Sequence, residues 1–212
     1  MDEFFNLLLQ HTITMMAIVD PLGVSAIMLS LLPRSTTKAQ MNAIALKATL
    51  TIVIAFGVVL ATGTFLLRLF GIEIDSLKVM GGIVLLLTAI KMVQGSLEGK
   101  EQSDEERKEA IANDAFAVIP LGIPITFGPG VFATVIILRG QSHDWVSLSA
   151  LIVAYLLVAL SVYFAFKNSI YIRKYLGITG QKIVTRLMGL IVGAIAVQFI
   201  VGGISTLVKH AI

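Results

Sequence analysis

The sequence predicts an all-α membrane protein in which six transmembrane helices form two inverted three-helix repeats. The composition is 57% hydrophobic and only 14% charged, with a mean hydropathy of +0.92, which is too apolar for an ordinary soluble domain. The apolar residues gather in segments close to the roughly 20 residues that cross about 30 Å of hydrocarbon as a helix. Proline and glycine recur at matching positions in the two halves of the chain, which is typical of internally repeated membrane proteins.

The predicted spans follow one another along the chain, and two of them are interrupted. We place them at residues 4–31, 43–67, 78–97, 115–138, 145–166 and 185–208. The first is longer than a straight span needs, and the run Ile18-Val19-Asp20-Pro21-Leu22-Gly23 breaks its middle. The fourth is broken by Phe127-Gly128-Pro129-Gly130. Both breaks are predicted near the bilayer midplane, where freed backbone groups are tolerated only against protein or a water-filled cavity.

The two halves of the chain repeat each other. One shift in numbering lays Pro21 on Pro129, Met80-Gly81 on Met188-Gly189 and Gly95 on Gly203. Each half contains three spans, an odd number, so the second half is predicted to be inverted relative to the first. The predicted organisation is a first repeat over residues 1–97, a charged linker over 98–114 and a second repeat over 115–212, all in one membrane domain. The mixed charges of the linker are typical of a solvated segment or short surface helix.

The lysines and arginines predict the orientation in the membrane. One side is flanked by Arg68, Lys78, Arg139 and Lys209, whereas the others, except the intramembrane Lys91, lie in or beside the loops after the first, third and fifth spans. The positive-inside rule therefore places these loops in the cytoplasm, including the linker, and both termini outside. Because the basic residues are dispersed and form no single stripe, we expect no nucleic-acid partner.

Several chemistries lack the residues that they need. The chain has no cysteine, and its three histidines are scattered without ligand spacing, so we expect neither a metal site nor a cofactor. It has no His-Glu-x-x-His motif, no phosphate-binding loop and no Ser-His pair within the spans, so we do not expect an enzyme.

Three motifs follow one another along the chain. They are Asp20-Pro21-Leu22-Gly23, the run Val118-Ile119-Pro120-Leu121-Gly122-Ile123-Pro124-Ile125 leading to Gly128-Pro129-Gly130, and Thr185-Arg186-Leu187-Met188-Gly189-Leu190-Ile191. Together they resemble the MarC family of bacterial and archaeal inner-membrane proteins over nearly the whole chain. The resemblance implies a six-span protein related to the LysE-type exporters, a group that includes the SnatA transporter of small neutral amino acids. The sequence departs from the family at Ala26, where many members have a second proline, so we expect a gentler break in the first repeat than in the second.

Asp20 is an acid well inside a predicted span, where its insertion costs roughly 2.5–3.5 kcal/mol. It is interpreted either as a site for a substrate ammonium group or a proton, or as the N-cap of the half-helix that resumes after it, and the two roles are compatible. The amides following Gly23 and Gly130, at the positive ends of the resumed helices, are candidate anion sites. A carboxylate at these amides with an amine near Asp20 describes a zwitterionic amino acid.

Other residues carry weaker predictions. The candidate substrate-binding residues are Asp20, Pro21, Gly23, Thr126, Gly128, Pro129, Gly130 and Gln198. The Thr126 hydroxyl faces either substrate or backbone, and Gln198 forms either an interhelical hydrogen bond or a substrate contact. Lys91 either snorkels to the interface or pairs with Asp20. The glycines of the third and sixth spans predict close helix packing, and Trp145 predicts an interfacial anchor.

The sequence therefore favours a secondary transporter that exports or exchanges small neutral amino acids by alternating access at a midplane site. Because ATP-binding motifs are missing, transport is expected to depend on a gradient, with H+ or Na+ as candidate coupling ions. A channel for small solutes and a non-transporting accessory or sensor protein of the inner membrane are the alternatives. A homo-oligomer is compatible with the sequence.

Reporter fusions test the predicted orientation. A fusion at Glu105, in the linker, should report a cytoplasmic location, and a fusion at His210 should report an external one, because the basic loops are retained on the cytoplasmic side. Activities in the reverse pattern would refute this topology.

Overall fold

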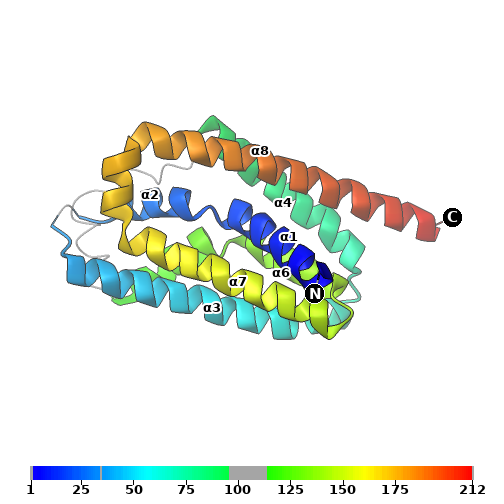
Figure 1. Cartoon of the computed structure of the whole chain (residues 1–212). Coiled ribbons are helices and arrows are strands. Elements are labelled where there is room, and N and C mark those ends of the chain that lie inside the picture. The colour runs from blue at the N-terminus through cyan, green and yellow to red at the C-terminus, as the bar shows by residue number, and fades with distance from the viewer. Residues whose placement is uncertain (1, 34, 96–113, 212) are drawn as a thin grey trace.

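The computed structural model is a bundle of helices, and it describes residues 2–33, 35–95 and 114–211 (Figure 1). The elements are α1 (Asp2–Val19), α2 (Pro21–Leu31), α3 (Lys38–Leu69), α4 (Ile74–Gln94), η1 (Asp114–Ala117), η2 (Val118–Thr126), α6 (Pro129–Gln141), α7 (Trp145–Lys167) and α8 (Ser169–Ala211). No strand occurs in the described ranges, and the predicted linker lies outside them except at its last residue.

Five helical segments are long and apolar enough to cross a membrane, or up to six if the bent pair η2 and α6 forms one span. The predicted class, an all-α multi-pass membrane protein, is confirmed at this level. The segment Asp2–Leu31 is one 30-residue candidate span, whereas η2 and α6 are bent by 57°. The interruption in the first segment is therefore gentler than that in the fourth, in agreement with the expectation from Ala26.

The last helix begins earlier than the sequence predicted. Its expected start was residue 185, but α8 begins at Ser169 and turns at Gly177, whose φ of 66° suits glycine. The chain crosses one end of the bundle before α8 runs back along it (Figure 1). Because Arg173, Lys174 and Lys182 make this segment polar, its hydropathy resembles that of a loop although it is helical.

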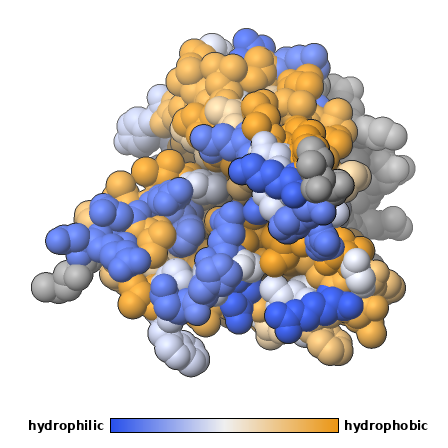
Figure 2. All heavy atoms as spheres, turned by 90° about the vertical axis from the view of Figure 1, so that its right-hand side faces the viewer, coloured by the Kyte–Doolittle hydropathy of each residue, from blue (hydrophilic) through white to orange (hydrophobic). Residues whose placement is uncertain are grey.

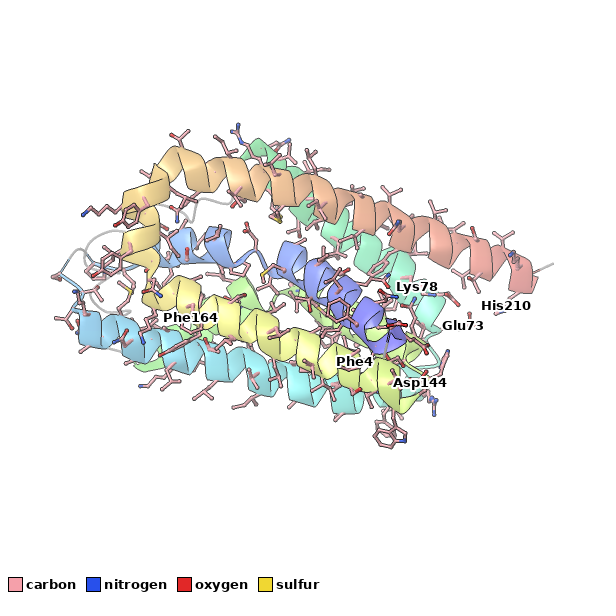
Figure 3. All side chains as sticks on the ribbon, viewed as in Figure 1. Phe4, Glu73, Lys78, Asp144, Phe164 and His210 are labelled. Atoms are coloured by element: carbon pink, nitrogen blue, oxygen red, sulfur yellow. The ribbon has the colours of Figure 1, made fainter. Side chains whose placement is uncertain are left out.

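The surface has the distribution expected of a membrane protein. Large apolar side chains are exposed along the helices, among them Ile54, Phe65 and Leu190. Polar residues gather over the end of the bundle that carries the termini, with apolar side chains around them (Figure 2). The labelled residues Glu73, Lys78, Asp144 and His210 all lie at this end (Figure 3). An apolar belt with polar ends fits a bundle whose sides face lipid.

Among the described helices, α4 and α8 form the most extensive contact, and glycines allow their backbones to approach closely. A Cβ added to Gly82 would lie 2.8 Å from the Ala196 carbonyl oxygen, and one added to Gly203 would lie 2.6 Å from the Asp75 carbonyl oxygen. Since these neighbours are backbone atoms, they cannot move aside cheaply. The predicted close packing of these two glycines is confirmed, whereas Gly202 has nothing within 4 Å.

Gly82→Ala should destabilise the protein. The new methyl group would overlap Ala196 and Ile200, and overpacking of this kind costs typically about 1–3 kcal/mol, against a gain of about 1 kcal/mol from helix propensity. Thermal unfolding in detergent should show a lower midpoint for Gly82→Ala. The matched variant Gly202→Ala, which meets open space, should keep or raise the midpoint; the same decrease in both variants would contradict the packing argument.

Candidate functional site

The interruption between α1 and α2 is a single residue, Asp20. Its backbone is left-handed, with φ 45° and ψ 71°, and no other non-glycine residue of the described chain has a positive φ. Its carboxylate oxygen Oδ1 accepts a hydrogen bond of 3.2 Å from the Gly23 backbone N–H. The N-cap interpretation of Asp20 is therefore confirmed. Only glycine fits at position 23, because an added Cβ would collide with the Asp20 carboxylate.

The same interruption leaves three backbone carbonyls free. Pro21 has no N–H, and the Gly23 N–H turns to the Asp20 side chain. The carbonyl oxygens of Ala17 and Val19 therefore lose their helical donors, and the Leu22 N–H does not bond to the Ile18 carbonyl, so no described group donates to any of the three. These carbonyls lie at the negative end of α1, next to the Asp20 carboxylate. This part of the site is an arrangement of oxygen acceptors suited to a cation.

The second oxygen of the carboxylate is also unsatisfied. Asp20 is only 5% exposed, and its Oδ2 has no hydrogen bond of good geometry among the described residues. The Thr185 hydroxyl, from α8, lies beside this carboxylate. One turn earlier on α8, Gln181 is buried and its Nε2 also lacks a partner. Asp20 therefore belongs to a polar seam between α2 and α8, in which Asp20 Oδ2 and Gln181 Nε2 are buried without a hydrogen-bond partner among the described residues.

Sequence reasoning missed the Thr185 and Gln181 contributions. Thr185 appeared only as part of a family motif, and Gln181 fell in a segment assigned to a loop. The available signal was their spacing of four residues, which places two polar side chains on one face of a helix. The segment had to be recognised as helical before that spacing carried information.

The second interruption has the opposite character. It lies between η2 and α6, and α6 begins with Gly128 as N-cap and Pro129 at the first position, without a side-chain cap. Within the described chain, no group accepts a hydrogen bond from the backbone N–H of Gly130 or Val131, although both residues are buried. These amides lie at the positive end of α6, and such an end favours an anion.

Side chains around the second interruption hold it in place. The Thr126 hydroxyl donates to the Leu121 carbonyl at 2.8 Å, so it bonds to backbone. The Phe127 ring meets Tyr155 edge-on, with centroids 6.4 Å apart, and Tyr155 stacks on Phe56 at 3.8 Å. The Tyr155 hydroxyl donates to the Ile52 carbonyl at 3.1 Å. The uncapped end of α6 is thereby attached to α3 and α7.

The structure brings some of the predicted residues together and not others. The helix contacts place α1 against α6 and α2 against η2, so the two interrupted segments pack together. Gln198 lies on an exposed face of α8 and forms no hydrogen bond within the described chain. Lys91, exposed near the end of α4, forms no ion pair with Asp20.

One predicted feature of the first interruption is wrong. The amides after Gly23 were expected to bind an anion together with those after Gly130. The Gly23 N–H instead donates to Asp20 Oδ1, and the Val24 N–H donates to the Asp20 carbonyl at 2.9 Å. The protein's own carboxylate therefore occupies the start of α2. Of the two helices that resume after an interruption, α6 is the one whose N-terminal end stays open.

The part of the chain that the structure describes contains no group of three or more histidine, aspartate or glutamate side chains that could hold a metal ion. The cation-attracting groups are instead one carboxylate and backbone carbonyls.

A bundle of long apolar helices with two interruptions defines an integral multi-pass membrane protein. The family model described as "MarC family integral membrane protein" matches residues 5–208, and the chain belongs to this family. It is 33% identical over 210 residues to a UPF0056 membrane protein of Aquifex aeolicus, covering 99% of this chain and 98% of that protein. It is 32% identical over 200 residues to the UPF0056 membrane protein YhcE of Escherichia coli, covering 94% and 93%. No solved structure matches the chain.

Replacements of Asp20 test its capping role by stability alone. Asp20→Asn should unfold at nearly the wild-type temperature, because asparagine caps as well as aspartate and also tolerates the left-handed conformation. Asp20→Ala should be destabilised by at least about 1 kcal/mol, since it loses the cap and puts a Cβ-bearing residue without a polar side chain at φ 45°. Thermal unfolding of the two variants in the same detergent provides the comparison; equal stability of both would argue against the cap.

Proposed function

We propose that the protein is a secondary transporter of the cytoplasmic membrane that moves small neutral amino acids by alternating access. The observation that carries the proposal is the pair of unlike interruptions: unpaired carbonyls with a buried carboxylate at one, and unpaired amides at the other. Unpaired backbone groups are costly in a membrane unless they line a site or a water-filled cavity. Discontinuous helices in transporters commonly provide such sites.

A zwitterionic amino acid matches both ends of this arrangement. Its ammonium group would face Asp20 Oδ2 and the carbonyls of residues 17–19, while its carboxylate would accept from the Gly130 and Val131 amides. The free backbone amides of α6 thus match the substrate carboxylate, and the free oxygens around Asp20 match its ammonium group. The side chains around the interruptions are mostly apolar, including Val19, Phe127 and Leu85, so a small uncharged substrate side chain fits best.

The helix packing supports two inverted repeats. Exchanging the first three spans with the last three pairs α1 and α2 with η2 and α6, α3 with α7, and α4 with α8. Under this exchange the contact of α1 with α7 corresponds to that of η2 with α3, and the contact of α2 with α8 corresponds to that of α6 with α4. Both resumed helices also begin on the prolines that the sequence repeat aligns, Pro21 and Pro129. Such symmetry would place the two interruptions near the midplane and allow two related conformations.

The orientation in the membrane and an energy source are further parts of this proposal. A linker on the cytoplasmic side and external termini agree with the distribution of basic residues. Asp20 is the candidate carrier of a coupling proton, and the free carbonyls beside it are candidate ligands for Na+. Export or exchange then needs only an ion or substrate gradient.

Asp20→Asn separates substrate binding from folding. The variant keeps the cap but removes the negative charge of the side chain. In proteoliposomes it should therefore lose nearly all saturable counterflow of labelled alanine, glycine and serine. A matched control is Asp2→Asn, an exposed acid at the start of α1, which should leave transport unchanged.

Other outcomes would favour other functions. Flux that never saturates and needs no gradient would indicate a channel. Absence of amino-acid flux in the folded wild-type protein would favour an accessory protein. Saturable flux that Asp20→Asn leaves intact would remove Asp20 from the substrate site.

A further inference from the structure

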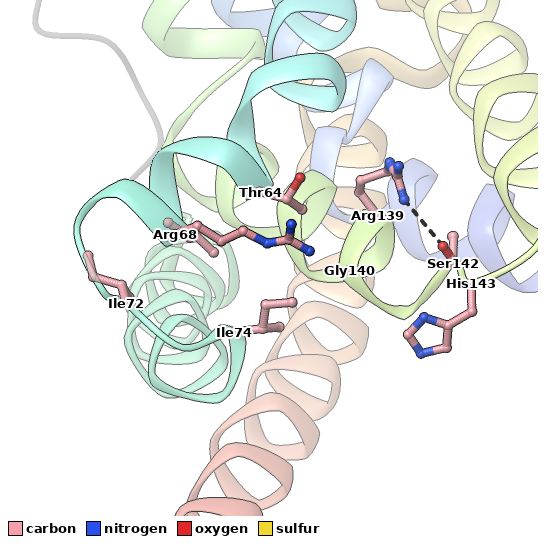
Figure 4. Close-up of a pocket in the computed structure, with 9 residues that line it drawn as sticks. Thr64, Arg68, Ile72, Ile74, Arg139, Gly140, Ser142 and His143 are labelled. Carbon is pink, nitrogen blue, oxygen red and sulfur yellow. Dashed lines mark hydrogen bonds between the residues drawn. The ribbon is translucent and has the colours of Figure 1, made fainter.

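A cavity of about 330 Å³ lies at the end of the bundle where α3, α4 and α6 meet (Figure 4). Its lining includes Thr64, Arg68, Ile74, Arg139, Ser142 and His143. Arg68 comes from the last turn of α3 and Arg139 from the last turn of α6. None of these residues is among the polar groups described above at the two interruptions, so the cavity is separate from that site.

The cavity concentrates positive charge that the described residues do not neutralise. Neither Arg68 nor Arg139 forms an ion pair within the described ranges. Arg139 Nη1 donates one hydrogen bond, of 3.2 Å, to the Ser142 carbonyl, which leaves its other N–H groups open. Two guanidinium groups lining one cavity repel each other, and an anion between them relieves this repulsion.

The nearby acids have other positions or partners. Asp75 pairs with Lys78 at 2.7 Å. Asp144 caps α7, where its Oδ1 accepts from the Ser147 backbone N–H at 2.6 Å. Glu73 is exposed at the N-cap of α4, without a side-chain hydrogen bond there. Within the described ranges, none of these carboxylates forms an ion pair with Arg68 or Arg139.

The C-terminal end of α3 does not depend on the Arg68 side chain for capping. Cations often stabilise the negative end of a helix, but α3 closes its own terminal carbonyls with backbone groups. The Phe70 N–H donates to the Leu66 carbonyl at 3.1 Å, and the Ile72 N–H donates to the Leu67 carbonyl at 2.8 Å. Capping of the helix end therefore does not explain why an arginine stands at position 68.

Side chains typical of the membrane interface surround the cavity. Trp145, which is 84% exposed, follows the lining residue His143 by two positions, and exposed tryptophans mark the membrane interface. Phe65, Leu69 and Phe70, which lie near Arg68 in the sequence, are 64–73% exposed, as expected of side chains that face lipid. A ligand here would thus meet both the interface and the hydrocarbon.

We propose that Arg68 and Arg139 bind the phosphate group of an anionic phospholipid in this cavity. The planar guanidinium group of arginine can donate two parallel hydrogen bonds to phosphate oxygens. The Thr64 and His143 side chains, which also line the cavity, can donate further hydrogen bonds. The neighbouring apolar surface would accommodate the acyl chains. This inference does not depend on the proposed transport activity.

Lipid titration of the purified full-length protein tests the proposal. Phosphatidylglycerol added to the protein in neutral detergent should raise its unfolding temperature, because a ligand that binds only the folded state stabilises it. Arg68→Gln should weaken the lipid affinity about tenfold, and the double variant with Arg139→Gln should abolish the shift. Lys209→Gln, an exposed cation outside the cavity, is the matched control and should keep the wild-type shift.

Two further arms identify the source of the phosphate. Phosphatidylcholine, which has no net charge, and inorganic phosphate should each give a much smaller shift than phosphatidylglycerol. An equal shift with inorganic phosphate would overturn the lipid assignment, and an unchanged phosphatidylglycerol affinity in Arg68→Gln would overturn the site. Arg68→Gln removes no described hydrogen bond, so it remains informative even if loss of the Arg139–Ser142 contact prevents folding.

Discussion

The hydrogen bond from the Gly23 backbone N–H to the Asp20 carboxylate lets the first long apolar segment be interrupted by one residue. Proline at position 21 removes one donor, and the carboxylate accepts from another, so the carbonyls at the end of α1 remain free. An aspartate tolerates the left-handed backbone and caps the following helix with the same side chain. The need for a small residue at position 23 follows directly, since the carboxylate occupies the space of a Cβ.

The two interruptions differ because only one has an acidic cap. At the first, Asp20 supplies negative charge and occupies the start of α2; at the second, Gly128 has no side chain, and the start of α6 stays open. The two repeats share the proline at the start of the resumed helix but differ in the residue before it. This one difference makes the first helix start a site of hydrogen-bond acceptors and the second a site of hydrogen-bond donors. This asymmetry is the physical basis of the amino-acid proposal.

The sequence predicted the class and the positions of the interruptions because proline, glycine and long apolar runs have strong local effects. It also identified Asp20, since an acid within such a run is unusual. The N-cap role of Asp20 was one of its two compatible interpretations, and the Gly23 hydrogen bond confirms it. The sequence did not predict that Gln198 would lie on an exposed face or that Thr185 would lie beside Asp20. These features depend on how helices are rotated and which backbone group a side chain reaches, and neither is fixed by hydropathy or spacing alone.

Binding of one-ended substrate analogues tests the central claim, a site with separate poles for ammonium and carboxylate, most directly. Thermal stabilisation of the purified protein should be measured with alanine, with ethylamine, which lacks the carboxylate, and with propionate, which lacks the ammonium group. The account predicts saturable stabilisation by alanine and little by either analogue at the same concentration. Stabilisation by ethylamine or propionate as strong as that by alanine would contradict a two-pole site.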